Sequence, residues 1–246
     1  AAKKGILKAI PEADVVVRPL ADGGEGTVEA LVEGMNGEYQ TATVTGPLGA
    51  PVECQYGIIK ESNMAIIEMS GAAGITLVTS EERNPLHTTT YGVGEVIKDA
   101  IKKGCRKFLV GIGGSATNDL GIGMLQALGY EFLNKDGEQV AFGAKGIADI
   151  VTIKDDKVIP ELKECSFKIA CDVTNPVCGE SGCSAIYGPQ KGATKEMIQD
   201  MDQWMLAFTE LVKTYNPNAD ANVPGTGAAG GLGYAFLTFT NAAAAE

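Results

Sequence analysis

The sequence predicts an α/β protein, built as one large domain or as two smaller ones, on the basis of three observations. With 246 residues, 45% of them hydrophobic, the chain is long enough to bury a sizeable core. Apolar runs typical of strands are followed by a glycine-rich loop and a segment of helical periodicity, at 14–32 and again at 107–128. Between residues 38 and 69 the pattern changes to alternation interrupted by turn-forming residues, which is typical of an antiparallel meander.

The individual elements follow from apolar spacing and from the residues that end each run. Helices are expected over the following segments: 1–10, from 28 onward, 93–101 and 122–128. Buried strands are expected at 14–20, 107–112 and 167–171, and meander strands at 41–45, 52–56 and 65–69. The clearest helix begins after Thr194, a good N-cap residue, and runs to Tyr215. Its Met-rich apolar stripe is expected to lie in the core.

The charge balance and the cysteine pattern argue against several classes of protein. Twenty Lys and Arg against 31 Asp and Glu give a formal net charge of −11, and the three arginines are scattered. A general nucleic-acid binder needs a concentrated cationic face, so no nucleic-acid partner is expected. The six cysteines include no C-x-x-C pair. This argues against a disulfide scaffold and a zinc site, and it favours reduced thiols in the cytoplasm.

No membrane or export signal is expected either. Residues 1–10 form an amphipathic run with no apolar core and no cleavage site. Residues 221–245 are uncharged and long enough to span a bilayer, but they contain Pro224, five glycines and several polar residues. We interpret this segment as a buried, glycine-rich part of the fold.

Glycine-rich loops carry the functional information in this sequence. Three polar loops of this kind enter helices, at 22–27, 111–119 and 188–194, and a fourth stretch, 225–233, is nearly all backbone. Glycine lets amide N–H groups point into a shared concavity, and a helix N-terminus adds partial positive charge, so such loops bind anions. One loop alone is explained by a tight turn, whereas four in one chain together indicate an anionic ligand.

The loop at 111–119 has the richest chemistry. Residues 111–116 fit G-x-G-x-x-A loosely, but the acidic residue that should end the next strand is not in place, and no G-x-x-x-x-G-K-[ST] motif exists. Its hydroxyls and amides can hold phosphate oxygens or a sugar-like hydroxyl, and its carboxylate can accept a proton or hold Mg²⁺. Alternatively, Asn118 and Asp119 only cap the following helix. The candidate residues are Gly113, Gly114, Ser115, Thr117, Asn118 and Asp119.

Two further polar residues are candidates for chemistry. Lys191 lies at the tip of the 188–192 loop, three residues before an N-cap, where it would face a bound anion together with the helix dipole. The alternative is a solvated surface lysine. His87 is the only histidine, and no G-x-S-x-G motif accompanies it, which favours a loop or capping role over a hydrolase triad.

Five stretches together resemble the type 1 glycerate kinases, the family that phosphorylates D-glycerate with ATP. The resemblance covers the chain essentially from end to end, and the stretches follow the family's order. They are Leu20-Ala-Asp-Gly-Gly-Glu-Gly-Thr27, Asn84-Pro-Leu-His-Thr-Thr-Thr-Tyr-Gly92, Gly111-Ile-Gly-Gly-Ser-Ala-Thr-Asn-Asp119, Cys171-Asp-Val-Thr-Asn-Pro176 and Tyr187-Gly-Pro-Gln-Lys-Gly-Ala193.

The resemblance implies two α/β lobes with the reactive cleft between them. One lobe is flavodoxin-like and assembled from both chain ends, and the other is an inserted mixed α/β lobe that contains the antiparallel meander. On this pattern residues 1–37 are a fragment of the flavodoxin-like lobe, 38–240 are the inserted lobe, and 241–246 are a chain break or a return towards the first lobe. Family members also begin with an Asp-Ser-x-Lys-Gly loop and continue past Asn241 with a Gly-Glu-Gly-rich loop. Neither is present here, so we expect a chain truncated at both ends and inactive by itself.

The resemblance also implies roles for the candidate residues. Asp119 is expected to be the base or the orienter of the glycerate hydroxyl, fixed by Asn118 and Ser115. Lys191 is expected to neutralise phosphate charge, and Asp172 or Asp22 to hold Mg²⁺. The remaining expected contacts to substrate or phosphate are Gly113, Gly114, Thr117, Asp22, Gly23, Gly24 and Gln190.

The implied reaction is ATP-dependent phosphorylation of D-glycerate, usually to 2-phosphoglycerate in this family. Two alternatives remain open at the level of sequence. One is an NAD(P)-dependent oxidoreductase that uses the 111–119 loop, and the other is a domain that senses an anion without turnover. The sequence does not determine the oligomeric state.

Overall fold

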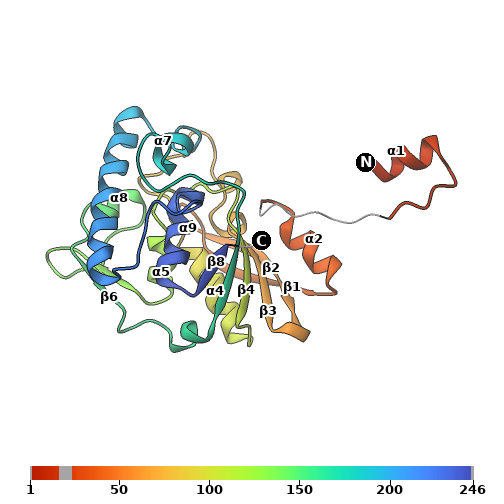
Figure 1. Cartoon of the computed structure of the whole chain (residues 1–246), viewed down its shortest axis with the longest axis horizontal. Helices are drawn as coiled ribbons and strands as arrows, with labels where there is room; N and C mark the ends of the chain where they lie inside the picture. Colours follow the sequence, from red (N-terminus) through yellow and green to blue (C-terminus); the bar gives the residue numbers. More distant parts are fainter. Residues whose placement is uncertain (1, 17–23, 245–246) are drawn as a thin grey trace.

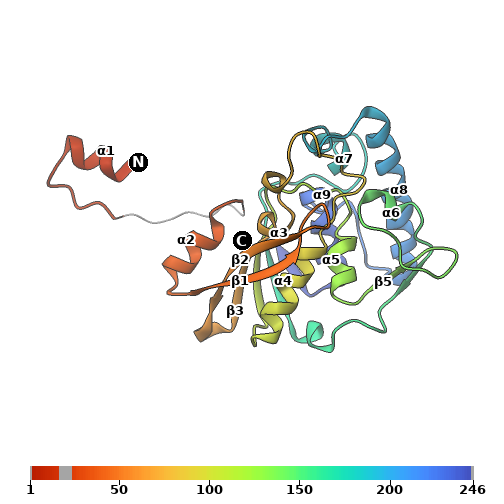
Figure 2. The same cartoon turned by 180° about the vertical axis from the view of Figure 1, so that it is seen from behind.

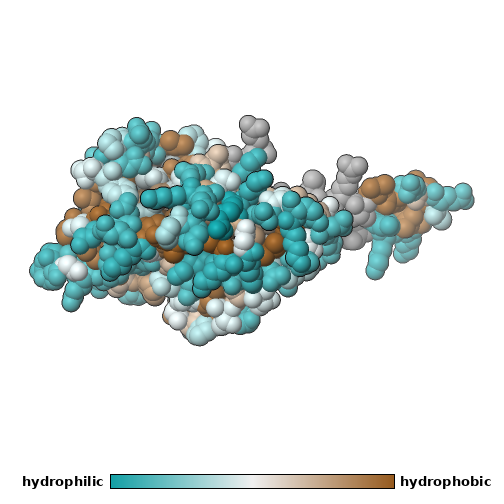
Figure 3. All heavy atoms as spheres, turned by 90° about the horizontal axis from the view of Figure 1, so that it is seen from below, coloured by the Kyte–Doolittle hydropathy of each residue, from teal (hydrophilic) through white to brown (hydrophobic). Residues whose placement is uncertain are grey.

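The computed structural model describes residues 2–16 and 24–244, and it has the mixed α/β architecture that the sequence predicts. A six-stranded sheet runs through the body of the molecule, with helices on both of its faces (Figures 1 and 2). The short helix α1 (Ala2–Ala9) lies apart from this body (Figures 1 and 3), and Ile6 of α1 and Ile10, directly after it, are exposed. No helix within the described ranges is long and apolar enough to cross a membrane.

The sheet joins an antiparallel part to a parallel part. Strands β1, β2 and β3 form the predicted antiparallel meander, and β3, β4, β7 and β8 are parallel to one another in that order. A separate pair, β5 and β6, is antiparallel. The bounds are Glu38–Thr45 (β1), Pro51–Ile59 (β2), Met64–Glu68 (β3), Lys107–Gly111 (β4), Glu131–Leu133 (β5), Thr152–Lys154 (β6), Ser166–Ala170 (β7) and Ala242–Ala244 (β8).

Helices cover the two faces of the sheet because successive strand residues point in opposite directions. Ile66 of β3 packs with α2 on one face, whereas its neighbours Ala65 and Ile67 belong to the main core on the other face with α4. Short 3₁₀ turns lie at 60–62, 75–77, 160–164 and 189–191. The α-helices are Thr27–Gly34 (α2), Ser70–Ala73 (α3), Tyr91–Lys102 (α4), Ile122–Ala127 (α5), Ala144–Ile147 (α6), Cys183–Tyr187 (α7), Lys195–Tyr215 (α8) and Ala228–Phe239 (α9).

The long helix α8 confirms its predicted start and most of its predicted apolar stripe, although Tyr215 at its end is exposed. The Thr194 hydroxyl accepts a hydrogen bond from the Met197 amide at 3.3 Å, which is the expected N-cap. The predicted apolar stripe is buried at Met201, Met205 and other positions one turn apart. The helix therefore begins directly after the 188–194 loop and fixes one end of that loop to the core.

One predicted element differs from the structure. Residues 14–20 were expected to form a buried strand, but Asp14–Val16 have no strand conformation, and 72% of Val16 is exposed. Residues 17–20 lie outside the described residues. The apolar run has no partner strand in the described part of the chain, and a strand needs such a partner to satisfy its backbone groups. The boundary near residue 37 stays a prediction, and α2, just before it, packs on β2 and β3.

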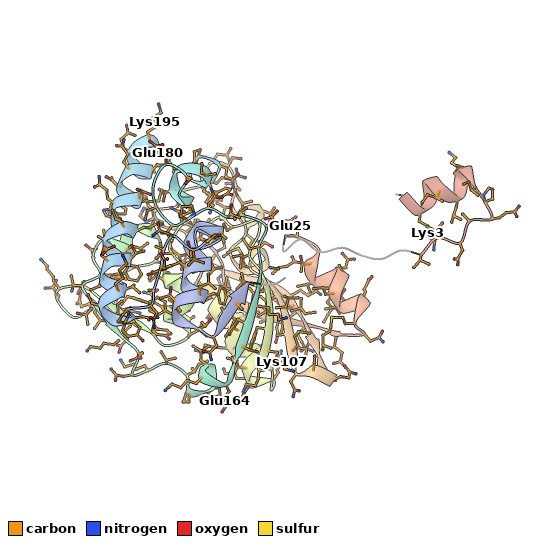
Figure 4. All side chains as sticks on the ribbon, in the orientation of Figure 1. Lys3, Glu25, Lys107, Glu164, Glu180 and Lys195 are labelled. Carbon is orange, nitrogen blue, oxygen red and sulfur yellow. The ribbon has the colours of Figure 1, made fainter. Side chains whose placement is uncertain are left out.

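The parallel strands place the loops that follow them, including the glycine-rich loop 111–119, at one edge of the sheet. Gly111 at the end of β4 lies in register with Ala170 at the end of β7, and Glu68 at the end of β3 lies in register with Gly111. The loops that leave these strands therefore start side by side at one edge of the sheet, where α/β proteins commonly bind ligands. Figure 4 labels Lys107 at the opposite, N-terminal end of β4.

An aromatic pair between β4 and β7 stabilises the strands that carry these loops. Phe108 and Phe167 are both buried, and their rings stack with centroids 4.7 Å apart. We expect Phe108→Ala to lower the free energy of unfolding by about 3–5 kcal/mol, because it removes a buried ring and leaves a cavity. Urea denaturation checks this. Leu206→Ala, on the exposed face of α8, is the control and should change stability by less than about 0.5 kcal/mol; equal effects of the two substitutions would contradict the role of the pair.

Candidate functional site

A cleft of about 180 Å³ opens at the C-terminal edge of β4 and β7. Four segments form its walls: the loop after β4, the loop after β7, the end of α7 with the 3₁₀ turn at 189–191, and the start of α9. Three of the four glycine-rich loops predicted to bind an anion therefore meet at one place. The lining residues are Ile112, Gly113, Gly114, Ser115, Ala170, Cys171, Asp172, Val173, Tyr187, Gln190, Lys191, Ala228 and Ala229.

Backbone amides line two walls of this cleft. The N–H groups of 113–115 on one wall and of 229 on the other have no acceptor among the described residues, and the same holds for Gly230, which follows 229 but does not itself line the cleft. Gly114 has φ of 71°, and Ala229, Gly230 and Gly231 are all left-handed. A Cβ at Gly230 would lie 2.2 Å from the Thr117 carbonyl oxygen, so only glycine permits this close approach. Such convergent, unpaired donors are suited to an anion.

Lys191 is the cation of the cleft. Only 2% of this residue is exposed, and its Nζ donates to Ser115 Oγ at 2.9 Å and to the Thr117 carbonyl oxygen at 2.6 Å. The alternative of a solvated surface lysine is therefore wrong. Burial lowers the pKa of the Lys191 ammonium to about 8, although the charge of Asp119 opposes this. The side chain ties the 188–192 loop to the 111–119 loop and keeps its charge at the cleft wall.

Asp119 lies behind the cleft and holds the loop. Its Oδ2 accepts hydrogen bonds from the Thr90 amide (2.8 Å), the Thr90 hydroxyl (2.9 Å) and the Gly123 amide (3.3 Å), and its Oδ1 accepts one from the Gly121 amide (3.1 Å). The residue is fully buried and does not line the cleft. Burial raises the pKa of its carboxyl, and these hydrogen bonds oppose the rise. The geometry favours the capping role at the start of α5 over contact with a substrate.

Asn118 and Thr117 also support the loop from behind. Asn118 Nδ2 donates to Ser184 Oγ at 2.9 Å and contacts Met201 Sδ at 3.3 Å, so the loop is attached to α7 and α8. Asn118 Oδ1 and Thr117 Oγ1 are buried, and neither has a hydrogen-bond partner in the described structure. Of the predicted site residues, the structure thus places Gly113, Gly114, Ser115, Lys191, Gln190 and Asp172 on the cleft wall, and Thr117, Asn118 and Asp119 behind it.

The residues predicted to hold a metal ion, and those predicted from the 22–27 loop, are not brought together at the cleft among the described residues. Asp172 is exposed on the cleft wall, but the described residues contain no group of three or more His, Cys, Asp or Glu side chains that could hold a metal ion. Asp22 and Gly23 lie outside the described residues. Gly24 accepts a hydrogen bond from the Thr27 amide near the start of α2 and does not line the cleft.

The apolar and aromatic residues of the cleft wall were not among the site residues predicted from the sequence. Tyr187 lines the cleft, and its hydroxyl donates to Asn175 Oδ1 at 2.8 Å, while the Asn175 carbonyl oxygen accepts from the Gly227 amide at 2.9 Å. Asn175 thereby joins the loop after β7 to α7 and to the start of α9. Tyr187 and Asn175 belong to motifs noted in the sequence, but only their spacing in three dimensions indicates this role.

The fold and the cleft are those of an α/β protein with an amide-lined, lysine-containing site suited to a small anionic ligand. The glycerate kinase family matches residues 1–246, and the chain therefore belongs to this family. The chain is 43% identical to glycerate kinase of Halalkalibacterium halodurans and 44% identical to glycerate 2-kinase of Escherichia coli strain K12. Each match covers 98% of this chain and 64% of the relative, so the chain spans about two thirds of their length.

A solved structure supports the same assignment. The crystal structure of a protein assigned as glycerate kinase 2 from Salmonella typhimurium LT2 superposes with a TM-score of 0.92 at 42% identity. The match covers 99% of this chain and 65% of that one. These relationships give no support to the oxidoreductase alternative or to a domain that only senses an anion.

The buried position of Lys191 predicts a pH-dependent affinity for phosphate. Because its pKa is about 8, the ammonium loses its proton as the pH rises through that value, and pyrophosphate affinity should fall. We expect Lys191→Met to weaken pyrophosphate binding by roughly tenfold to a hundredfold at pH 7 and to remove most of this dependence. Calorimetry between pH 6.5 and about 9 measures both effects.

The control is Lys195→Met, because Lys195 is an exposed lysine at the start of α8. This variant controls for the loss of one charge and for the titration of pyrophosphate itself. The same loss of affinity in both variants would contradict the assignment of Lys191.

Replacing Asp119 tests whether this residue positions the loop or acts as the catalytic base. In Asp119→Asn an amide group would face donors that now meet a carboxylate, so we expect a loss of about 2–3 kcal/mol in the free energy of unfolding. Asp136→Asn, at an exposed turn, should leave stability unchanged. Thermal or urea denaturation measures the difference. Normal stability together with abolished turnover would instead support the base that the sequence predicts.

Proposed function

We propose that this protein transfers the γ-phosphoryl group of ATP to a hydroxyl of D-glycerate, giving 2-phosphoglycerate. The observation that carries this proposal is the cleft lined by Lys191 and by four residues whose backbone amides have no acceptor among the described residues, namely 113–115 and 229. Membership of the glycerate kinase family and the names of its relatives in two bacteria support the choice of reaction.

The reaction requires positioning and charge neutralisation more than covalent chemistry. The glycerate hydroxyl oxygen forms a bond to the γ-phosphorus, the bond from phosphorus to the β,γ-bridging oxygen breaks, and its electron pair leaves with ADP. The hydroxyl proton is released to a base or to water. The amides of 113–115 and the Lys191 ammonium would stabilise negative charge on the phosphoryl oxygens as it develops. Asp119 would act by holding these amides in place.

The cleft could hold a magnesium ion that is bound mainly through the phosphates of ATP and only in part by the protein. Asp172 is the one carboxylate among the described residues that line the cleft. Mg²⁺ in kinases is commonly held by one or two carboxylates together with waters and substrate phosphates, so this donor set suits Mg²⁺ that is bound largely through ATP. When bound, the ion would neutralise phosphate charge, and Asp172 would orient it. Asp22, the second candidate ligand, lies outside the described residues.

The position of the cleft agrees with a two-lobed enzyme. The cleft is open to solvent at the sheet edge, where a second lobe could cover a bound nucleotide. We propose that residues 1–37 belong to a flavodoxin-like lobe, that 38–240 form the inserted lobe, and that 241–246 are a return towards the first lobe, in which 242–244 pair as β8 with β7 of the inserted lobe. The curated relatives, which are longer than this chain, are consistent with such a second lobe.

A coupled assay with D-glycerate, ATP and Mg²⁺ tests this function. For a protein that contains both lobes we expect ADP formation that depends on D-glycerate, and a phosphorus NMR signal of 2-phosphoglycerate in the product, whereas residues 1–246 alone are expected to give neither. Oxidation or reduction of NAD(P)H with a hydroxy acid would contradict the proposal. Binding of glycerate and ATP without any product from the intact protein would support the sensing alternative instead.

A further inference from the structure

Arg83 lies next to the cleft, and it has no role in the reaction proposed above. Its Nη1 donates to the backbone carbonyl oxygen of Gln190 at 3.3 Å, and Gln190 lines the cleft. Gln190 is also the residue next to Lys191, the cation of the cleft. Arg83 does not itself line the cleft, but its guanidinium group contacts the backbone of a residue that does.

The position of Arg83 is fixed by a close backbone contact. Gly192 adopts a left-handed conformation with φ of 89°, and a Cβ there would lie 2.2 Å from the Arg83 carbonyl oxygen. Only glycine allows the two backbones to approach this closely. The turn that carries Lys191 is thus packed directly against the backbone of Arg83.

The guanidinium group has donors to spare. Arginine has five N–H donors, and Gln190 uses one of them over a long distance. The Arg83 Nε is buried and has no hydrogen-bond partner in the described structure. No carboxylate of the described residues lies within 4 Å of the side chain, whereas Arg106 forms an ion pair with Glu164 at 2.8 Å. A half-buried cation without an acidic partner commonly indicates a site for an anion.

The chemistry of the ligand calls for a second cation. The chain has a formal net charge of −11, and Asp172 adds a negative charge to the cleft wall. A phosphate chain carries several negative charges, which one buried lysine does not balance. Arginine binds phosphate oxygens in a bidentate manner through parallel N–H groups.

We propose that Arg83 binds a phosphate group of the ligand at the mouth of the cleft, beside Gln190 and Lys191. This inference rests on the proposed function only in that it names a phosphate-bearing ligand for the same cleft. It predicts that Arg83 contributes to phosphate affinity and not to the binding of the hydroxy acid.

Calorimetry with inorganic pyrophosphate on the full-length protein tests the assignment. We expect Arg83→Gln to weaken pyrophosphate binding by roughly tenfold to a hundredfold, Arg83→Lys to weaken it less, and Arg106→Gln to leave it unchanged. The salt dependence of binding should become shallower in Arg83→Gln, which a purely structural defect would not produce. Binding of D-glycerate should be the same in wild type and Arg83→Gln.

A chemical readout keeps the test independent of the stability of the variants. Phenylglyoxal should modify Arg83 in the wild-type protein, and pyrophosphate should protect Arg83 but not Arg106, as followed by peptide mass spectrometry. Pyrophosphate binding that depends on Arg83 supports the inference even in a protein that fails to phosphorylate glycerate. Unchanged pyrophosphate affinity in Arg83→Gln, absence of pyrophosphate binding to the wild type, or a selective loss of D-glycerate binding would overturn it.

Discussion

The buried ammonium of Lys191 is the interaction on which the rest of the site depends. It joins two loops through Ser115 Oγ and the Thr117 carbonyl oxygen, which lie 76 and 74 residues away from Lys191 in the sequence. A lysine is seldom buried without a partner, because removing its charge from water is costly. Two short hydrogen bonds offset part of that cost, and the open cleft leaves room for an anion to offset more. The same desolvation that makes the position expensive makes the charge effective on a ligand.

Behind this lysine, a layer of buried polar residues holds the loop in shape. Asp119 accepts four hydrogen bonds from Thr90, Gly121 and Gly123, and Asn118 is attached to Ser184. The amides of 113–115 belong to the same loop, so their positions are set by residues that do not line the cleft. Preorganised donors of this kind need little rearrangement when charge develops on a bound phosphate. The polar layer and the parallel strands together turn a flexible, glycine-rich sequence into a defined surface.

Much of the fold was predictable because it depends on local spacing. The meander over 38–69, the strand before Gly111 and the helix capped by Thr194 all follow from period and turn residues, and the structure confirms them. The strand expected at 14–20 is absent where the residues are described, because alternation and apolarity do not supply a partner strand. The sequence indicated that the glycine-rich loops together bind an anionic ligand, and the structure brings three of them to one cleft. The parallel register of β4 and β7 positions one of the three, 111–119, beside the loop after β7.

The sequence by itself determined the class of fold, the anion-binding character of the loops and the resemblance to glycerate kinases, since each is a property of residue types at short range. It did not determine which polar residues face the ligand. Asp119 and Lys191 are both charged and both lie in glycine-rich loops, but the first is directed into the protein and the second to the cleft wall. Arg83 and Tyr187 reach the cleft region only through contacts with distant segments. Tertiary structure decided these points because the direction of a side chain is fixed by what packs around it, and those neighbours come from elsewhere in the chain.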